Sequence, residues 1–258
     1  MELSTGPVFY RDSGGGGVPI VFLHAASGNS IMWEHQIAAF TGAGYRFIAI
    51  DYRGLDAATG ARDWSDQIEA LVAKLGMDRF HLLGTAAGGG AAFQYALAYP
   101  ARLRSLIVAN SHGNVMDKDY IEMGKRIRPS PQFDALPVDF RELGPSYRAA
   151  NPDGVARWLA LSARERVVQA QSPTTAPNDR FALTPERSVT WAKLEKLRTP
   201  TLLITGDADL YTPPSVLRMF LSHMRDAQSS LIPETGHSAY WENPECFNRS
   251  VLHFICQH

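Results

Sequence analysis

Short apolar runs alternate with amphipathic stretches along most of this chain. The apolar runs cover residues 19–23, 45–50, 80–83, 103–108 and 200–205. Runs that are almost continuously apolar are typical of strands in a parallel sheet that is covered on both faces. The stretch 64–75 instead places Trp64, Ile68 and Leu71 on one stripe of a helix. This alternation predicts an α/β fold with a doubly wound, mostly parallel sheet.

The alternation stops near residue 113 and resumes near residue 198. The sequence between these points is helical in pattern and is repeatedly interrupted by proline. We interpret residues 113–190 as a helical cap that is inserted into an α/β core of residues 1–112 and 191–258. Within this cap, residues 171–179 are rich in Pro, Thr, Ser and Asn, and we expect a loop there.

Charge and cysteine content argue against several classes of partner. The net charge is -1, with acidic and basic residues interspersed, so we expect no binding to nucleic acid. The N-terminus has no signal-peptide pattern and no apolar run is long enough to span a membrane, which predicts a cytoplasmic protein without a membrane partner. Cys246 and Cys256 fit no metal-ligand spacing, and reduced thiols suit the cytoplasm. We expect no metal and no cofactor.

The segment 82–90 carries the most specific motif. A strand leads into Gly84-Thr85-Ala86-Ala87-Gly88, and a helix rich in small residues follows. This is the layout of a nucleophile elbow, G-x-S-x-G, whose central residue sits on a strained turn above the sheet. The flanking glycines are needed because larger side chains would collide with the neighbouring backbone. Here the apex is Ala86, which has no nucleophilic atom.

Two later segments supply an acid and a histidine. Asp207 and Asp209 follow the run 200–205, and the carboxyl end of a strand is where open α/β sheets place their sites. We favour Asp209 as the catalytic acid, because Asp207 can instead shape the turn. His237 follows Gly236 and precedes a terminal helical pattern, and it is the candidate base. The order of elbow, acid and histidine matches that of α/β-hydrolases.

The loop after the run 19–23 is a candidate oxyanion hole. It contains His24, Ala25, Ala26 and Gly28, and small residues allow backbone amides to point into a site. We assign the two donors to the backbone N–H groups of Ala26 and Ala87. We interpret His24 as a residue that holds this loop in place rather than as a proton carrier.

Together these motifs resemble the α/β-hydrolase superfamily, in the capped group that includes lactonases, esterases, epoxide hydrolases and carbon–carbon bond hydrolases. The resemblance covers nearly the whole chain and includes residues 24–26, 51–54, 84–88, 206–209 and 236–237. It implies a Ser-His-Asp triad, in which serine attacks a carbonyl carbon, histidine takes the serine proton and aspartate orients the histidine. The chain has His24-Ala25 where the family pattern has His-Gly, which is a mild departure.

The departure at Ala86 is severe, since loss of the serine lowers kcat by a factor on the order of 10⁶ in such a triad. Thr85 is one position early, and Ser111 and Ser238 do not occupy the apex. Three explanations stay open. Ala86 can be a serine-to-alanine substitution introduced into a serine hydrolase. The chain can be a natural enzyme that uses a His237–Asp209 dyad, as in lyase or cofactor-free oxygenase chemistry. It can also be a binding protein or pseudo-enzyme.

The cap offers apolar side chains that could line a pocket. The candidates for substrate contact are His24, Met116, Tyr120, Met123, Trp158, Tyr211 and Ser238, with Leu159, Phe181 and Trp191 as further apolar lining. Packing between cap and core is the alternative for each cap side chain. Lys125, Arg126 and Arg128 could bind a substrate carboxylate or could form a solvated helix face. An apolar pocket of this kind suits a small or medium organic ester, lactone or diketone.

Overall fold

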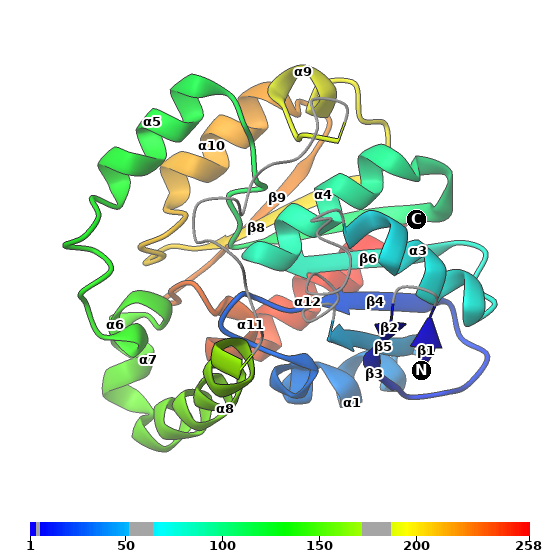
Figure 1. Cartoon of the computed structure of the whole chain (residues 1–258), viewed down its shortest axis with the longest axis horizontal. Helices are drawn as coiled ribbons and strands as arrows, with labels where there is room; N and C mark the ends of the chain where they lie inside the picture. Colours follow the sequence, from blue (N-terminus) through cyan, green and yellow to red (C-terminus); the bar gives the residue numbers. More distant parts are fainter. Residues whose placement is uncertain (4–5, 52–63, 172–186) are drawn as a thin grey trace.

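A seven-stranded sheet forms the centre of the described part of the chain, which in this computed structural model comprises residues 1–3, 6–51, 64–171 and 187–258 (Figure 1). Its strands, in spatial order, are β3 (Phe9–Asp12), β5 (Arg46–Asp51), β4 (Pro19–Leu23), β6 (Phe80–Thr85), β7 (Leu103–Ala109), β8 (Thr201–Gly206) and β9 (Gln228–Ile232). Only β3 runs antiparallel to its neighbour in this sheet, and every other pair is parallel. A separate hairpin joins β1 (Glu2–Leu3) to β2 (Gly6–Pro7).

The central strands bury apolar side chains on both faces. In β4, Val21 and Leu23 belong to one hydrophobic cluster, whereas Ile20 and Phe22 belong to the other. Successive side chains of a strand point to opposite faces, so this split is the expected period of two. Because both faces are covered, the sequence of each central strand is almost continuously apolar.

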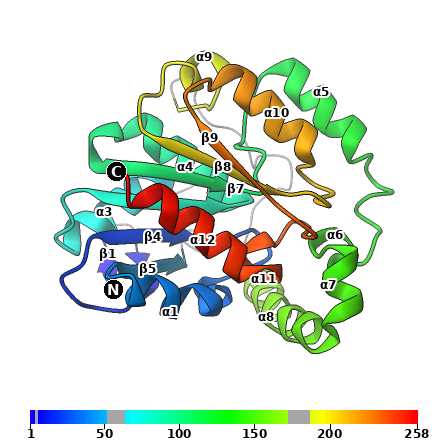
Figure 2. The same cartoon turned by 180° about the vertical axis from the view of Figure 1, so that it is seen from behind.

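Helices cover the two faces of the sheet. One face carries α3 (Trp64–Lys74), α4 (Ala87–Ala98) and α10 (Pro214–His223). The other face carries the 3-10 helix η1 (Ser30–Trp33), α1 (Glu34–Gly42) and α12 (Pro244–Ile255). Figures 1 and 2 show these two layers from opposite sides. The predicted doubly wound, mostly parallel α/β fold is confirmed.

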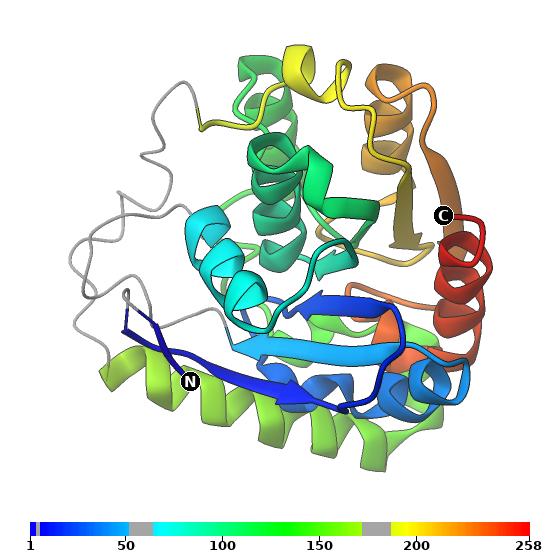
Figure 3. The same cartoon turned by 90° about the vertical axis from the view of Figure 1, so that its right-hand side faces the viewer.

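The segment between β7 and β8 is helical. It contains α5 (Lys118–Ile127), α6 (Val138–Glu142), α7 (Pro145–Ala150), α8 (Pro152–Gln171) and α9 (Trp191–Leu194). Figures 1 and 2 place α5 to α8 beyond the carboxyl ends of the strands, and Figure 3 shows α8 outside the sheet layer. The loop expected at residues 171–179 lies outside the described residues from residue 172 onward, as does Phe181.

The strand order reverses next to β4, which lies between β5 and β6. In open α/β sheets, ligands bind outside the carboxyl ends of the strands at such a switch point. The loops that follow β4, β6, β7 and β8 all start at this edge, and they carry Ala26, Ala86, Asn110 and Asp209. The topology therefore gathers the candidate residues from distant parts of the sequence. The structure describes Asp51 of the expected motif at 51–54, and the rest of that motif lies outside the described residues.

Candidate active site

Ala86 stands on a sharp turn between β6 and α4. Its backbone has φ 51° and ψ -115°, a region that non-glycine residues rarely adopt. The Ala86 N–H donates to the carbonyl of Ala109 (3.0 Å), and the N–H of Gly89 donates to the carbonyl of Ala86 (3.1 Å). Ser111 Oγ also donates to the Ala86 carbonyl. The strained turn is therefore held from β7 and from the first turn of α4.

Close backbone packing explains the two flanking glycines. A Cβ atom on Gly84 would collide with the backbone of Gly88, and one on Gly88 would collide with the carbonyl oxygen of Leu23. The elbow thus needs glycine at both positions for steric reasons, as the motif predicts. Ala86 and Ala87 are partly exposed above this packing.

Asp209 lies in the turn after β8, and the hydrogen bonds that it accepts favour its ionised form. Its Oδ1 accepts the N–H groups of Tyr211 (2.8 Å) and Thr212 (2.9 Å). Its Oδ2 accepts Thr212 Oγ1 (2.5 Å) and Asn110 Nδ2 (2.9 Å). Burial alone would raise the pKa of Asp209. The charge of His237 and the hydrogen bonds outweigh burial and hold that pKa well below its usual value. Asp207, the alternative acid, is exposed.

His237 is buried and lies against Asp209. Its Nδ1 is 3.0 Å from Oδ1 and 2.9 Å from Oδ2 of that carboxylate. Burial alone would lower the pKa of His237, but the charges of Asp209 and Glu142 and the hydrogen bond to Asp209 raise it. Because Nδ1 is engaged by the acid, Nε2 is the ring nitrogen that can exchange a proton with the pocket.

The loop after β4 holds its histidine inside the protein. His24 is buried, its Nδ1 lies 2.7 Å from the carbonyl oxygen of Ala25, and its Nε2 lies 3.9 Å from Oδ1 of Asp51. Asp51 also accepts the N–H and the hydroxyl of Ser30. Ala26, at the tip of this loop, is exposed. These contacts fit the interpretation of His24 as a residue that holds the loop.

The structure divides the predicted substrate-contact residues into two groups. Tyr120 and Trp158 are buried in the two hydrophobic clusters, Met123 packs against the first of them, and all three contribute to packing. Tyr211 instead lies beside the candidate base, with its ring centroid 4.4 Å from that of His237. Ser238 is buried next to His237 in sequence, and Met116 is exposed.

Arg128 is the one of the three predicted basic residues that approaches the site. Its guanidinium lies 5.7 Å from the centroid of the Tyr211 ring, and burial lowers its pKa. Lys125 is exposed and pairs with Glu122, and Arg126 is exposed as well. A line of side chains therefore runs from Arg128 through Tyr211 to His237.

Sequence reasoning missed three polar residues at this site. Asn110 Nδ2 donates to Asp209 Oδ2 and to the carbonyl of Gly236 (3.1 Å). Glu142 ends α6, is 7% exposed, and accepts the N–H of Ser238 at its carbonyl (3.1 Å). Asn110 could have been found, because it directly follows a predicted strand. No local pattern marks Glu142 or Glu242.

Glu242 joins the histidine loop to the segment after α6. It ends the short helix α11 (Ala239–Glu242) and accepts the N–H groups of Gly144 (2.6 Å), Gly236 (3.0 Å to each oxygen) and Ser238 (3.2 Å). Burial raises its pKa to about 7, although these hydrogen bonds act in the opposite direction. A Cβ atom on either Gly144 or Gly236 would collide with the other segment, so the two segments pack backbone against backbone.

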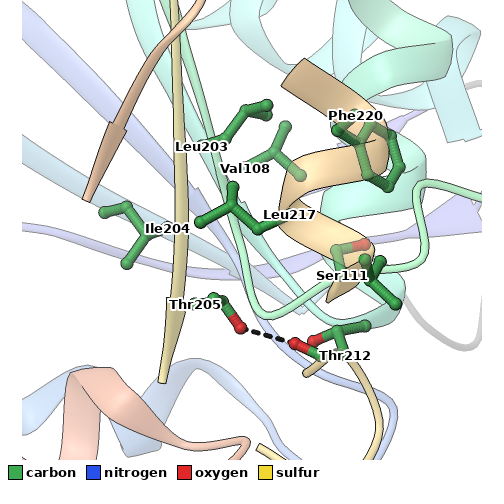
Figure 4. A pocket seen from close by; sticks show the side chains of 9 residues that line it. Val108, Ser111, Leu203, Ile204, Thr205, Thr212, Leu217 and Phe220 are labelled. Carbon is green, nitrogen blue, oxygen red and sulfur yellow. Dashed lines mark hydrogen bonds between the residues drawn. The ribbon is translucent and has the colours of Figure 1, made fainter. Parts of the chain in front are cut away.

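A small cavity lies behind the acid loop, between β7, β8 and α10 (Figure 4). Ser111, Thr205, Thr212 and Phe220 are among its lining residues, and Thr205 Oγ1 donates to the carbonyl of Thr212 (2.6 Å). Its volume is about 20 Å³, which suits about one water molecule and is far too small for an organic substrate. This cavity is therefore not a substrate site.

Metal and membrane features can be assessed for the described residues. Among them, no group of three or more His, Cys, Asp and Glu side chains could hold a metal ion. No helix in the described ranges is both long enough and apolar enough to cross a membrane. Cys246 and Cys256 are free thiols.

Comparison with known proteins identifies the family to which this chain belongs. The family model described as the alpha/beta hydrolase fold matches residues 18–244. The chain belongs to the α/β hydrolase fold family. The matched region extends from β4 to the start of α12, so it includes the elbow, the acid loop and the histidine loop.

Relatives of this α/β hydrolase carry several different names. This chain is 27% identical over 274 residues to a 2-hydroxy-6-oxononadienedioate/2-hydroxy-6-oxononatrienedioate hydrolase of Burkholderia vietnamiensis. The alignment covers 96% of this chain and 90% of the relative. A solved esterase of Thermogutta terrifontis has a TM-score of 0.75 at 24% identity, covering 99% and 97% of the two chains. The enol-lactonase of Burkholderia xenovorans has a TM-score of 0.75 at 17% identity, covering 99% of both. At these identities the solved structures support the fold only.

Proposed function

We propose that this chain has the active site of a serine hydrolase with alanine at the nucleophile position. In this proposal, Asp209 and His237 are the acid and base of a Ser-His-Asp triad, and Ala86 occupies the place of its serine. The substrate is a small or medium organic ester, lactone or related carbonyl compound. With Ala86 in place, the chain binds this substrate and fails to cleave it.

The observation that carries this proposal is the backbone of Ala86. A non-glycine residue in a sparsely populated backbone region costs about 1–3 kcal/mol, and such strain is usual where a side chain must be presented to a substrate. Ala86 has φ 51° and presents only a methyl group. The strained turn is thus maintained although the chain as written gains nothing from it, which is expected if the elbow was built for a serine.

The site contains the remaining parts of that chemistry. The Ala87 N–H is in the first turn of α4, where backbone donors have no partner within the helix and favour negative charge. We assign the oxyanion hole to this N–H and that of Ala26. In the Ala86→Ser protein, His237 Nε2 would take the serine proton, the serine oxygen would attack the carbonyl carbon, and the proton would pass to the leaving group.

The segment 113–190 is the proposed cap over this site. Its helices α5 to α8 lie beyond the carboxyl ends of the strands (Figure 1). From this segment, Arg128 lies over the Tyr211 ring and the carbonyl of Glu142 accepts the N–H of Ser238. Tyr211 and Ser238 adjoin His237 from the core. The relatives are named as esterase, enol-lactonase and hydrolases of oxo-dienoates, which supports a carbonyl substrate and leaves its class to experiment.

The direct test is Ala86→Ser. We expect hydrolysis of at least one of p-nitrophenyl butyrate, γ-butyrolactone and a 2-hydroxy-6-oxo-dienoate, at least about 10⁴-fold faster than with the unchanged chain. Initial rates in buffer near pH 8 measure this. Ala86→Gly is the matched control, since it alters the same position without adding a hydroxyl group. A folded Ala86→Ser protein that is inactive on all three compounds would contradict the proposal.

The intact His237–Asp209 pair favours one second candidate, a natural dyad enzyme. Asp209 is buried, fully hydrogen-bonded and ionised beside the imidazole, so the base can act without a serine. Such an enzyme, unlike an inactivated hydrolase, would catalyse deuterium exchange into acetylacetone with Ala86 in place, and His237→Asn would abolish it. A third possibility, a receptor, would bind ligands in calorimetry with no turnover in either assay.

A further inference from the structure

Two segments that are far apart in sequence meet backbone against backbone beside His237. Gly144, which follows α6, lies against Gly236 of the histidine loop, and a Cβ atom on Gly236 would lie 2.5 Å from the backbone nitrogen of Gly144. The N–H of Ser238 also donates to the carbonyl of Glu142 (3.1 Å). The residue before His237 and the residue after it therefore both contact the segment that follows β7.

One carboxylate accepts the N–H groups at this junction. Oε2 of Glu242 accepts the N–H of Gly144 (2.6 Å), and both carboxylate oxygens lie 3.0 Å from the nitrogen of Gly236. Oε1 also accepts the N–H of Ser238 (3.2 Å). Gly144 and Gly236 are buried, and in the described part of the chain Glu242 is the only acceptor of their two N–H groups.

These two buried N–H groups make the carboxylate important for the position of the histidine loop. A buried backbone N–H needs an acceptor, and leaving one unpaired costs more than a typical hydrogen bond contributes. Without Glu242 we expect the two segments to move until other acceptors, including water, are reached. Gly236 directly precedes His237, so this movement displaces the imidazole from Asp209, whose oxygens lie 2.9 and 3.0 Å from Nδ1.

We propose that Glu242 is a positioning residue for the proposed hydrolysis, which fixes His237 relative to the segment 113–190 by accepting backbone N–H groups from both. Glu242 acts through the backbone on either side of the base and does not contact the reacting atoms. Asp209 orients the imidazole ring, whereas Glu242 holds the loop that carries the ring. The effect on rate rests on the proposed function, but the position of the loop can be measured without turnover.

An adjacent cleft allows the missing carboxylate to be supplied from solution. Glu242 lines a surface cleft with a volume of about 310 Å³, together with residues of α1, α7, α8 and α11 that include His35, Tyr147, Arg157 and Trp241. Glu242→Ala removes one methylene group and the carboxylate, which together have the size of an acetate ion. Acetate that enters through the cleft can therefore accept the same N–H groups.

The first test uses NMR on the chain with Ala86 in place at pH 8. Burial raises the pKa of Glu242 to about 7, so the carboxylate is the main form at this pH. In Glu242→Ala, the amides of Gly144 and Gly236 should exchange faster with water, and the Nδ1 proton signal of His237 should be lost through exchange. The signal is assigned by its absence in His237→Asn. Sodium acetate should restore it, and sodium chloride at the same ionic strength should not.

Three variants separate positioning from a general loss of stability. Glu245→Ala removes an exposed carboxylate in the first turn of α12, and Ser105→Ala removes a buried hydrogen bond to His81 near the start of β7. Both should keep the His237 proton signal, although Ser105→Ala should lower the unfolding free energy. Glu242→Gln keeps the side-chain length, but its one carbonyl oxygen cannot accept all three amides. It should lose the signal without rescue by acetate, and it provides the test if Glu242→Ala does not fold.

The second test measures rates in the Ala86→Ser protein. A misplacement of about 1 Å can cost about 100-fold in rate, so Glu242→Ala should lower kcat by about 10- to 100-fold. KM should change by less than about 3-fold, because the substrate does not contact Glu242, and acetate should restore part of kcat. A rise in KM at unchanged kcat would contradict positioning.

The NMR result decides the role of Glu242 independently of hydrolysis. An unchanged His237 proton signal in both Glu242→Ala and Glu242→Gln would overturn the proposal, as would an equal loss of the signal in Ser105→Ala. Loss of the signal with rescue by acetate, combined with an inactive Ala86→Ser protein, would contradict hydrolysis and leave the positioning of the loop by Glu242 supported.

Discussion

Two buried carboxyl groups, of Asp209 and of Glu142, have pKa values that are shifted in opposite directions. Asp209 and Glu142 are almost equally buried, at 2% and 7% exposed. The pKa of Asp209 is held well below its usual value, whereas burial raises that of Glu142. Burial is the largest cause for both groups and acts in the same direction. The difference therefore lies in the hydrogen bonds and in the contact with His237.

The carboxyl groups differ in where their hydrogen-bond donors come from. Asp209 lies in a turn, and the turn's own amides at Tyr211 and Thr212 donate to it, as short acidic side chains in turns commonly arrange. Glu142 is the last residue of a helix, and its Oε2 has no hydrogen-bond partner among the described residues. Glu242 is intermediate, since amides from two other segments donate to it and burial still raises its pKa to about 7.

Removing the charge of the well-bonded carboxylate should have the largest effect. In the Ala86→Ser protein, Asp209→Asn is expected to lower kcat by about 10⁴-fold, because the imidazole loses the group that fixes its tautomer. Initial rates on the best substrate measure this loss. Glu142→Gln in the same background serves as the comparison and should lower kcat much less, because Asp209 is the carboxylate that bonds Nδ1 of His237. Equal losses of maximal rate in the two variants would remove the distinction between the two carboxyl groups.

Glu242, the intermediate case, should make the unfolding free energy of the protein depend on pH. The folded-state pKa of Glu242, about 7, lies above its ordinary value of 4.5, so its stabilising contribution is complete below pH 4.5 and is lost as the pH rises through 7. The unfolding free energy of the unchanged protein relative to Glu242→Gln should therefore fall by about 3 kcal/mol over this range. Urea unfolding at pH 4.5, 6 and 8 checks this. A pH-independent difference between the two proteins would disagree with a raised pKa.

Removal of one hydrogen bond should leave Asp209, like Glu142, with an incompletely bonded carboxyl group, and this should have a smaller effect. Thr212→Val keeps the side-chain shape but removes the hydroxyl that donates to Asp209 Oδ2 at 2.5 Å. A hydrogen bond to a charged group contributes about 1.5–3 kcal/mol, and we expect destabilisation near the lower end of this range in urea unfolding at pH 7. Thr41→Val is the control, since Thr41 Oγ1 bonds only carbonyls of its own helix. If Thr212→Val matched that control, the hydroxyl would not stabilise the carboxylate.

Local sequence predicted those parts of the molecule that depend on local interactions. The apolar runs at 19–23, 103–108 and 200–205 agree with β4, β7 and β8 to within a residue or two. The agreement is expected because strands that are buried on both faces have an almost continuously apolar sequence. Gly84 and Gly88 marked the elbow for a steric reason. In contrast, Tyr120 and Trp158 could not be separated from pocket-lining residues by sequence, since packing and lining use the same apolar side chains.

The sequence by itself determined the parallel α/β sheet, the order of elbow, acid and histidine, and the alanine at position 86. These features follow from periodicity and from residues that are adjacent along the chain. Only the tertiary structure decided that Asp209 rather than Asp207 meets His237, that Asn110 bonds the acid, and that the carbonyl of Glu142 accepts the N–H of Ser238. Residues 142 and 238 are far apart in sequence, and no local pattern can predict a contact that exists only after the segment between β7 and β8 packs against the histidine loop.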